Sequence, residues 1–248
     1  DVPEPDGFLF TFHLNTFLLM MMNGVASIDT ETGGVGELQC RTHALLSVGM
    51  FMKIGDEERT FGVHVRPAPG LIIDPGAVRV NGYSPELWER LGAVDETVAA
   101  MRVFSKLLEW RADYRCWLAK EGRPDWDARL NGLAHNVGHD RGFLLAMMSR
   151  CGLLDVFENA ESGAMHRRWE CSCAALAFWR RMHGKPGGCS MDDLTALRLG
   201  KSLDEVKAMR GDHHVATYDA ELAWRGYEWL CSGEKWIPGA DGRPAVKI

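Results

Sequence analysis

The stretch VASIDTETGG, residues 25–34, decides the expected fold, because a short apolar run ends there in two acids and two glycines. The run predicts a buried strand, and residues two apart in a strand lie on the same face. We therefore expect the side chains of Asp29 and Glu31 to project together. Two carboxylates this close repel each other unless one takes up a proton or a divalent cation binds both. The alternative is a pair of solvated surface acids, and the position after a buried strand favours the shared site.

Beyond this stretch, strand-like and helix-like patterns alternate, which predicts a mixed α/β domain. Residues 44–52 and 59–65 predict a hairpin around the polar turn at 55–58, and residues 130–134 a further strand. Ser84 and Pro85 are typical of a helix start, as N-cap and first helical residue. The remaining helices are expected at 95–118, 141–150 and 173–182, with shorter pieces over 190–210.

Apolar spacing predicts which faces of two long helices are buried. In the helix at 95–118, Val98 and Met101 belong to a series that recurs near the helical period and is expected to face the core. In the last helix the buried stripe is expected to comprise Ala216, Ala220, Ala223, Tyr227 and Leu230.

Two further segments combine acids with histidines. HNVGHD, residues 135–140, lies at the junction of an expected strand and helix, where Asp140 alone would be interpreted as a helix N-cap. HHVATYDA, residues 213–220, opens the last expected helix, and Asp219 lies on its inward stripe. A buried aspartate needs a partner, and because that stripe has no Lys or Arg near Asp219, a metal is the natural candidate.

The composition is that of an ordinary globular protein, with 248 residues, 46% hydrophobic and 25% charged. Its formal net charge of −6 is opposite in sign to that of proteins that coat nucleic acid by charge alone. Seven cysteines without a Cys-x-x-Cys pair predict free, mostly buried thiols in a reducing compartment, and a cytoplasmic location. The spacing of Cys171, Cys173, His183 and Cys189 does not match the usual zinc pattern.

The chain divides into three expected parts. Residues 7–22 are apolar, but Asp1, Glu4 and Asp6 precede them where a signal peptide has basic residues. The run is also interrupted by polar residues and falls short of the roughly 20 apolar residues that span a bilayer, so it is treated together with residues 1–6 as one N-terminal extension, 1–22. We expect it to lie outside the domain and predict no membrane partner. The domain itself is expected at 23–231, and a Gly/Pro-rich tail at 232–248.

Taken in order, the three acidic segments resemble the DEDDh family of 3′ to 5′ exonucleases, which includes the polymerase III epsilon proofreading domain and ribonuclease T. The matching patterns are Asp-x-Glu at 29–31, His-Asn-x-x-x-Asp at 135–140 and His-x-Ala-x-x-Asp-Ala at 214–220, and the resemblance covers about residues 24–230. It implies a ribonuclease H-like α/β fold, with a mixed central sheet of about five strands flanked by helices. It also implies metal-dependent release of nucleoside 5′-monophosphates from the 3′ end of DNA or RNA.

Each matching residue inherits an expected role from this resemblance. Asp29, Glu31, Asp140 and Asp219 would hold two Mg²⁺ or Mn²⁺ ions, which suits cations that prefer oxygen ligands. Two such ions about 4 Å apart can generate the attacking hydroxide and stabilise the leaving 3′ oxygen. His214, five positions before the third aspartate, would be the general base, and His213 has no assigned role.

Contacts with the terminal nucleotide are also expected from the resemblance. They involve the segment after the first acids and the start of the second motif, at Thr30, Thr32, Gly33, His135 and Asn136. Asn136 is alternatively expected to fix the local turn.

The sequence departs from the family pattern at two places. His139 stands where the family has a phenylalanine, so stacking or a hydrogen bond must replace an aromatic contact. Ser172 and Cys173 stand where the family often has Asp-Thr, and there we expect a structural difference only. The basic and aromatic stretch His166–Lys185 is compatible either with single-strand binding or with a solvated helix face.

The expected partner is nucleic acid with a free 3′ end, in single-stranded form, and the chain could also pair as a homodimer or with a polymerase. The competing hypothesis is a proofreading or accessory subunit that is active only in a complex. A domain whose catalysis has decayed is a third alternative, which the presence of all five key residues disfavours.

Overall fold

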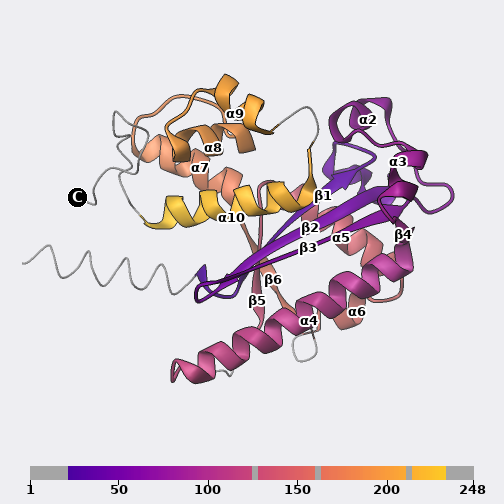
Figure 1. Cartoon of the computed structure of the whole chain (residues 1–248), viewed down its shortest axis with the longest axis horizontal. Coiled ribbons are helices and arrows are strands. Elements are labelled where there is room, and N and C mark those ends of the chain that lie inside the picture. Colours follow the sequence, from indigo (N-terminus) through magenta and orange to yellow (C-terminus); the bar gives the residue numbers. More distant parts are fainter. Residues whose placement is uncertain (1–21, 125–127, 160–162, 211–213, 233–248) are drawn as a thin grey trace, which may run out of the picture.

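The computed structural model describes residues 22–124, 128–159, 163–210 and 214–232, so the expected N-terminal extension up to residue 21 and the tail from residue 233 lie outside the described chain. Within these ranges the expected mixed α/β fold is confirmed. A sheet of six strands, in the order β4-β3-β2-β1-β5-β6, carries helices on both faces (Figure 1). The sheet has one strand more than the expected number of about five.

Strand β1 (Val25–Thr32) lies inside the sheet and extends through both acids of the first motif. It runs antiparallel to β2 (Leu45–Ile54) and parallel to β5 (Leu130–Ala134). Strand β2 forms the expected hairpin with β3 (Glu57–Arg66), and the two-residue β4 (Val94–Asp95) follows at that edge.

The sixth strand, β6 (Met165–Cys171), pairs with β5 at the other edge and was not predicted. Its sequence, MHRRWEC, is mostly polar because it is an edge strand, with several side chains exposed. The first six residues of the basic stretch, 166–171, therefore belong to the sheet and not to a helix face.

The helical elements fall between and after these strands. They are η1 (Glu37–Arg41), α2 (Pro75–Asn81), α3 (Pro85–Arg90), α4 (Glu96–Lys120), α5 (Val137–Arg150), α6 (Leu154–Phe157), α7 (Ser172–Met182), α8 (Met191–Leu199), α9 (Leu203–Arg210) and α10 (Ala216–Ser232). Ser84 caps α3 as expected, since its hydroxyl accepts a hydrogen bond from the Leu87 amide at 3.1 Å.

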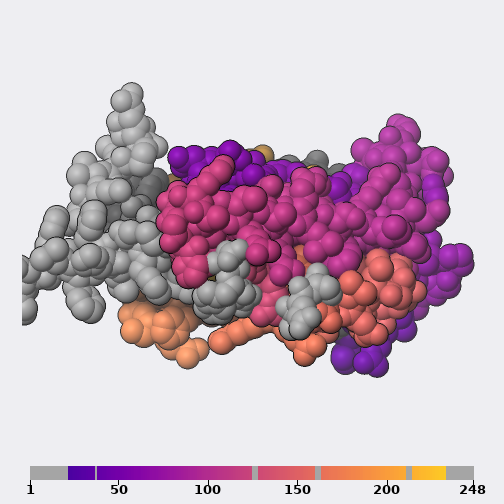
Figure 2. Space-filling view, turned by 90° about the horizontal axis from the view of Figure 1, so that it is seen from below, coloured from indigo at the N-terminus to yellow at the C-terminus, as the bar shows by residue number. Residues whose placement is uncertain are grey.

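Two layers of helix cover the sheet. Met50 and Met52 of β2 pack in one core cluster with α4 and α5, whereas Phe51 points to the other face and packs on Trp224 of α10. Met22, which the sequence boundary placed in the extension, is buried in this second cluster. Figure 1 shows α10 and α4 on opposite sides of the strands, and Figure 2 shows the face that α4 covers.

The buried face of α4 differs from the prediction. Val98 is 40% exposed and Met101 56% exposed, while Ala99, Ala100 and Val103 are fully buried. Alanines let the helix backbone approach the sheet closely, and the apolar period does not reveal that preference because larger side chains dominate it.

Two glycines bring α10 close to β1. Asp29 of β1 is opposite Gly49 of β2, which is in turn opposite Gly62 of β3. A Cβ at Gly49 would lie 2.1 Å from the backbone carbonyl carbon of Ala216, and one at Gly62 would lie 2.6 Å from Thr217 Cγ2. The first turn of α10 therefore rests directly on the sheet beside Asp29.

All seven cysteines are free thiols, and most are half-buried rather than buried as expected. Among the described helices, none combines the length and the apolar character needed to span a bilayer.

Candidate active site

A pocket of about 400 Å³ opens at the end of β1. Its lining includes Asp29 and Glu31 of β1, Asp140 in the first turn of α5, His214, and Asp219 in the first turn of α10. The structure thus brings together the five residues selected from the three motifs, although they come from three distant segments of the chain. Asp140 lies inside the helix, and the N-cap position belongs to Asn136.

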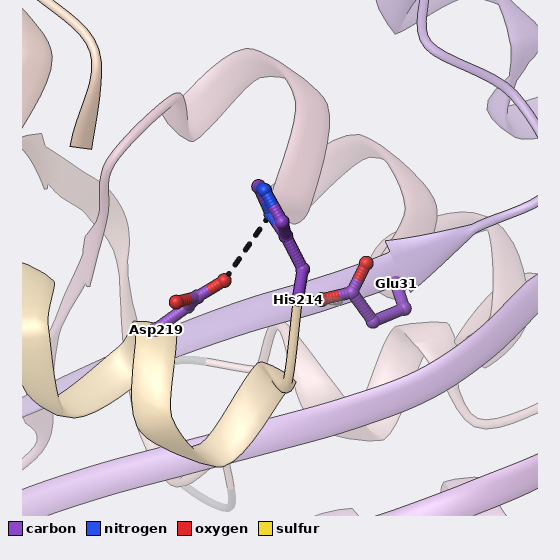
Figure 3. Close-up of side chains that lie close together, drawn as sticks. All are labelled: Glu31, His214 and Asp219. Carbon is purple, nitrogen blue, oxygen red and sulfur yellow. Dashed lines mark ion pairs between the residues drawn. The ribbon is translucent and has the colours of Figure 1, made fainter. Parts of the chain in front are cut away.

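Three of these side chains are near enough to share one ion. Oxygen and nitrogen atoms of Glu31, His214 and Asp219 lie within 4.8 Å of one another, and His214 Nδ1 is 3.4 Å from Asp219 Oδ2 (Figure 3). The side chain of Asp219 is only 2% exposed, and that of His214 is 42% exposed. Within the described ranges, no other group of three or more His, Cys, Asp or Glu side chains has this geometry.

Asp140 is held by Thr30. The Thr30 amide donates to Asp140 Oδ1 at 2.9 Å, and the Thr30 hydroxyl donates to the same oxygen at 2.8 Å. These bonds fix the orientation of a buried carboxylate.

Burial and neighbouring charges shift the pKa values of the acids and the histidine in this pocket. Burial, followed by repulsion from Asp140 and its other acidic neighbours, raises the pKa of Asp29 well above its ordinary value. Burial raises the pKa of Glu31 to about 8 and that of Asp140 to about 7, the Thr30 bonds opposing the rise at Asp140. Burial and then Arg210 lower the pKa of His214, which favours the neutral imidazole.

These features fit a pair of divalent cations. The donors are carboxylate oxygens, which Mg²⁺ and Mn²⁺ prefer. Glu31 Oε1 is buried and has no hydrogen-bond partner among the described residues, so it is an acceptor that a cation or a donor could satisfy. A bound cation would also relieve the repulsion that raises the pKa values of the acids.

Sequence reasoning missed two charged residues of this pocket. Arg210, the last residue of α9, donates through Nε to Asp219 Oδ1 at 3.0 Å and through Nη2 to Asp219 Oδ2. It also donates to Asp192 Oδ1, in the first turn of α8, at 2.8 Å. The expectation that Asp219 has no cationic partner is therefore wrong, because the partner comes from α9 and not from the helix face that carries Asp219. Arg210 precedes His214 by only four residues, and this closeness in sequence is the feature that could have indicated it as a partner of Asp219.

The expected substrate-contacting residues divide into two groups. Thr30, Thr32, His135 and Asn136 line the pocket, whereas Gly33 is not among its lining residues. The Gly33 amide instead donates to the Ala44 carbonyl at 2.7 Å, and a Cβ there would lie 2.5 Å from the Ile72 carbonyl oxygen. Gly33 is needed for this close approach of backbones.

His135 is already engaged by the protein. Its Nδ1 lies 2.9 Å from the Ser172 hydroxyl, and its Nε2 lies 2.9 Å from the Cys189 carbonyl oxygen. Its ring therefore links the end of β5 to the first residue of α7 and to the segment before α8. Ser172, one of the two departures from the family pattern, has this structural contact.

The other departure, His139, lines the pocket. Its Nε2 lies 3.2 Å from the Thr32 hydroxyl, and its ring packs on Phe143 at a centroid distance of 4.8 Å. A hydrogen bond and a ring contact thus replace the phenylalanine of the family pattern. The Thr32 hydroxyl also donates to the Gly34 carbonyl, and the Asn136 side chain makes no capping bond at α5.

The basic and aromatic stretch is only partly exposed. Phe178 is 63% exposed on α7, but Trp179 stacks on His183 and contacts Trp229 of α10. Arg180 donates to the Pro186 carbonyl and pairs with Asp193. Part of this stretch therefore fastens α7 to its neighbours.

Several curated proteins are similar in sequence to this chain. No protein-family model matches the chain. Ribonuclease T of Shewanella sp. (strain W3-18-1) is 31% identical over 135 residues, covering 51% of this chain and 52% of the relative. Ribonuclease T of Pectobacterium atrosepticum is 31% identical over 132 residues, with the same coverage. The chain thus spans about half the length of these relatives.

A longer and weaker match extends further along the chain. Ribonuclease T of Salmonella typhimurium is 28% identical over 200 residues, covering 78% of both proteins. Among solved structures, cell-death related nuclease 4 is similar with a TM-score of 0.50 and 12% identity, covering 83% of this chain and 62% of the other. The chain is therefore similar in sequence to ribonuclease T, which confirms the resemblance to the DEDDh exonuclease family, and it shares its fold with a solved nuclease.

Proposed function

We propose that the chain is a metal-dependent 3′ to 5′ exonuclease that releases nucleoside 5′-monophosphates. The observation that carries this proposal is the convergence of four acids from three segments on one pocket, with a histidine beside them. Relatives named ribonuclease T support the reaction class and favour RNA among the substrates.

Asp29, Glu31, Asp140 and Asp219 are the residues that would hold two Mg²⁺ or Mn²⁺ ions. When bound, such ions supply an activated water and stabilise charge on the leaving oxygen. Thr30 positions Asp140 for this task through two hydrogen bonds to one carboxylate oxygen.

His214 is proposed to accept the proton of the attacking water. It lies at the mouth of the pocket, 42% exposed, next to the buried carboxylate of Asp219. Its lowered pKa keeps a lone pair available at neutral pH, which a general base requires. Thr32 and Asn136 are proposed to contact the terminal nucleotide from the pocket wall.

The decisive experiment is a time course on 5′-labelled oligonucleotides of matched sequence, as DNA and RNA, single-stranded and duplex, with Mg²⁺, Mn²⁺ or EDTA. We expect stepwise shortening from the 3′ end that needs the metal. Asp29→Ala or Asp219→Ala should reduce the rate by at least roughly a hundredfold, the scale for losing one charge-stabilising group in a site.

Glu221→Ala is the matched control, because Glu221 lies on the same helix and pairs with Arg225 outside the pocket. Full activity of either aspartate variant would refute the assignment. If the isolated chain binds metal through Asp219 but shortens no strand, the hypothesis of a subunit active only in a complex gains support.

A further inference from the structure

Arg210 is a cation inside the cluster of acids that would hold the metals. Its side chain is only 8% exposed, and its guanidinium contacts both oxygens of Asp219 as well as Asp192. Arginine keeps its charge and offers a fork of donors that matches a carboxylate. In this structure the guanidinium therefore provides the positive charge next to Asp219.

The same guanidinium also contacts the proposed base. Arg210 Nη2 lies 3.0 Å from His214 Nδ1. Since arginine can only donate, Nδ1 must accept, which places the proton of the neutral ring on Nε2. Neither ring nitrogen then has a lone pair for a water molecule, so His214 cannot act as a base in this arrangement.

A divalent cation on Asp219 would lie within a few ångströms of the guanidinium, where like charges in a poorly solvated site repel strongly. The two cations therefore compete for the same carboxylate. Arg210 also pairs with Asp192, which lies on α8, is 19% exposed and is not one of the four proposed metal ligands. Arg210 therefore keeps one acidic partner when a metal ion takes Asp219.

We propose that Arg210 is a positioning residue that holds the metal-free site in a closed resting state, from which a metal ion must displace it. Release of Asp219 and release of His214 then occur together, because a single guanidinium holds both. The inference rests on the proposed metal-dependent function and adds to it a built-in competitor for the metal.

The test is calorimetric titration of Mn²⁺ into the full chain without substrate, for wild type, Arg210→Gln and Arg210→Lys. We expect Arg210→Gln to bind Mn²⁺ roughly ten- to a hundredfold more tightly, the range for removing a charge-assisted hydrogen-bonded partner. Arg210→Lys keeps the charge but loses the fork, so its affinity should lie between those of wild type and Arg210→Gln.

Lys207→Gln is the matched control, since it removes one positive charge from the exposed face of the same helix and should leave the affinity unchanged. An Arg210→Lys affinity equal to that of wild type would overturn direct competition and leave only a long-range charge effect. Equal affinities for all four proteins would overturn the inference entirely.

Melting temperatures provide a second measurement. In EDTA, Arg210→Gln should melt below wild type, because the acids lose their counter-ion, and saturating Mn²⁺ should close most of that gap. If Arg210 had only a structural role, Arg210→Gln would melt below wild type by the same amount in EDTA and in Mn²⁺. That result would contradict the proposal.

Failure of the proposed function gives a different result. If Asp219→Asn binds Mn²⁺ as tightly as wild type does, the metal assignment itself is wrong and the competition falls with it. If Mn²⁺ binding depends on Asp219 but is unaffected at Arg210, the inference alone fails.

Discussion

His214 is more exposed than the four acids of the pocket, with 42% of its side chain accessible. Its replacement should therefore separate metal binding from turnover. Because its proposed task is proton transfer, His214→Ala should leave Mn²⁺ affinity within a few-fold of wild type and reduce turnover by roughly 10² to 10⁴. Parallel calorimetry and single-turnover kinetics measure the two effects separately.

His213→Ala is the control, since His213 lacks the family spacing to Asp219 and should retain full turnover. If His214→Ala lost metal binding and turnover together, His214 would be a ligand and not a base. The geometry is compatible with a ligand role, because His214, Glu31 and Asp219 each have one atom close enough to bind the same ion.

At the scale of residues, the sequence predicted the parts of the site that local spacing encodes. Asp29 and Glu31 lie on the same face of one strand. His214 and Asp219 lie on either side of the start of α10, so their relative position follows from a single helix start. The pairing of Arg210 with Asp219 depends on how α9 packs beside α10, which no local pattern records. The family resemblance assigns Gly33 to a substrate contact, whereas the structure places it against the Ile72 carbonyl. That contact joins distant segments, so the local sequence does not reveal it.

At the scale of elements, the site depends on how closely α10 approaches the sheet. Gly49→Ala would place a methyl group against the backbone of Ala216, which cannot move without shifting the first turn of the helix. We expect a loss of about 1 to 3 kcal/mol in the free energy of unfolding, as for an overpacked core. Metal affinity should fall as well, because Asp219 lies in that turn.

Gly62→Ala is the comparison, because the close contact of the added methyl group would be with the Thr217 methyl, the end of a side chain that can rotate, while the nearest backbone atom, the Val48 carbonyl oxygen, is 4.0 Å away. Urea unfolding and Mn²⁺ titration should therefore show a smaller effect for Gly62→Ala on both quantities. Equal effects would show that the approach at Gly49 does not position Asp219.

The elements that the sequence predicted well are those with a strong local signal. The hairpin β2–β3, strand β5 and the capped α3 all agree with the expectation. Strand β6 failed because an exposed edge lacks apolar alternation, and the face of α4 failed because buried alanines carry little weight in an apolar period.

At the scale of the whole molecule, the buried acids link stability to pH and metal. A carboxyl group whose folded pKa is raised contributes stability below its unfolded pKa, and this is lost as pH rises through the folded value. For Asp140 and Glu31 the losses begin near the ordinary pKa values of 3.8 and 4.5 and are complete once the pH has passed the folded values of about 7 and about 8. The metal-free protein should therefore melt at a lower temperature near pH 9 than near pH 6.

Magnesium should weaken or reverse this trend, since bound cations need ionised ligands and their binding releases protons. Melting curves in EDTA and in Mg²⁺ across the same pH range measure both slopes, and Glu31→Gln should flatten the EDTA slope. Identical slopes with and without Mg²⁺ would contradict the linkage.

The net charge of −6 also changes meaning at this scale. Four of the acids converge on one pocket, and two divalent cations there would change the total to −6 + 4 = −2. An acidic chain can therefore attract a phosphate at its metals without attracting a strand along its whole surface.

The order in which the site is assembled has a consequence during synthesis. Asp29 and Glu31 leave the ribosome before Asp219, which lies in α10, the last described helix, and this helix must then dock on Gly49. A nascent chain therefore has an incomplete set of carboxylates until α10 has been synthesised. If the proposed activity includes RNA, the messenger being translated is protected from its own product until that helix has folded.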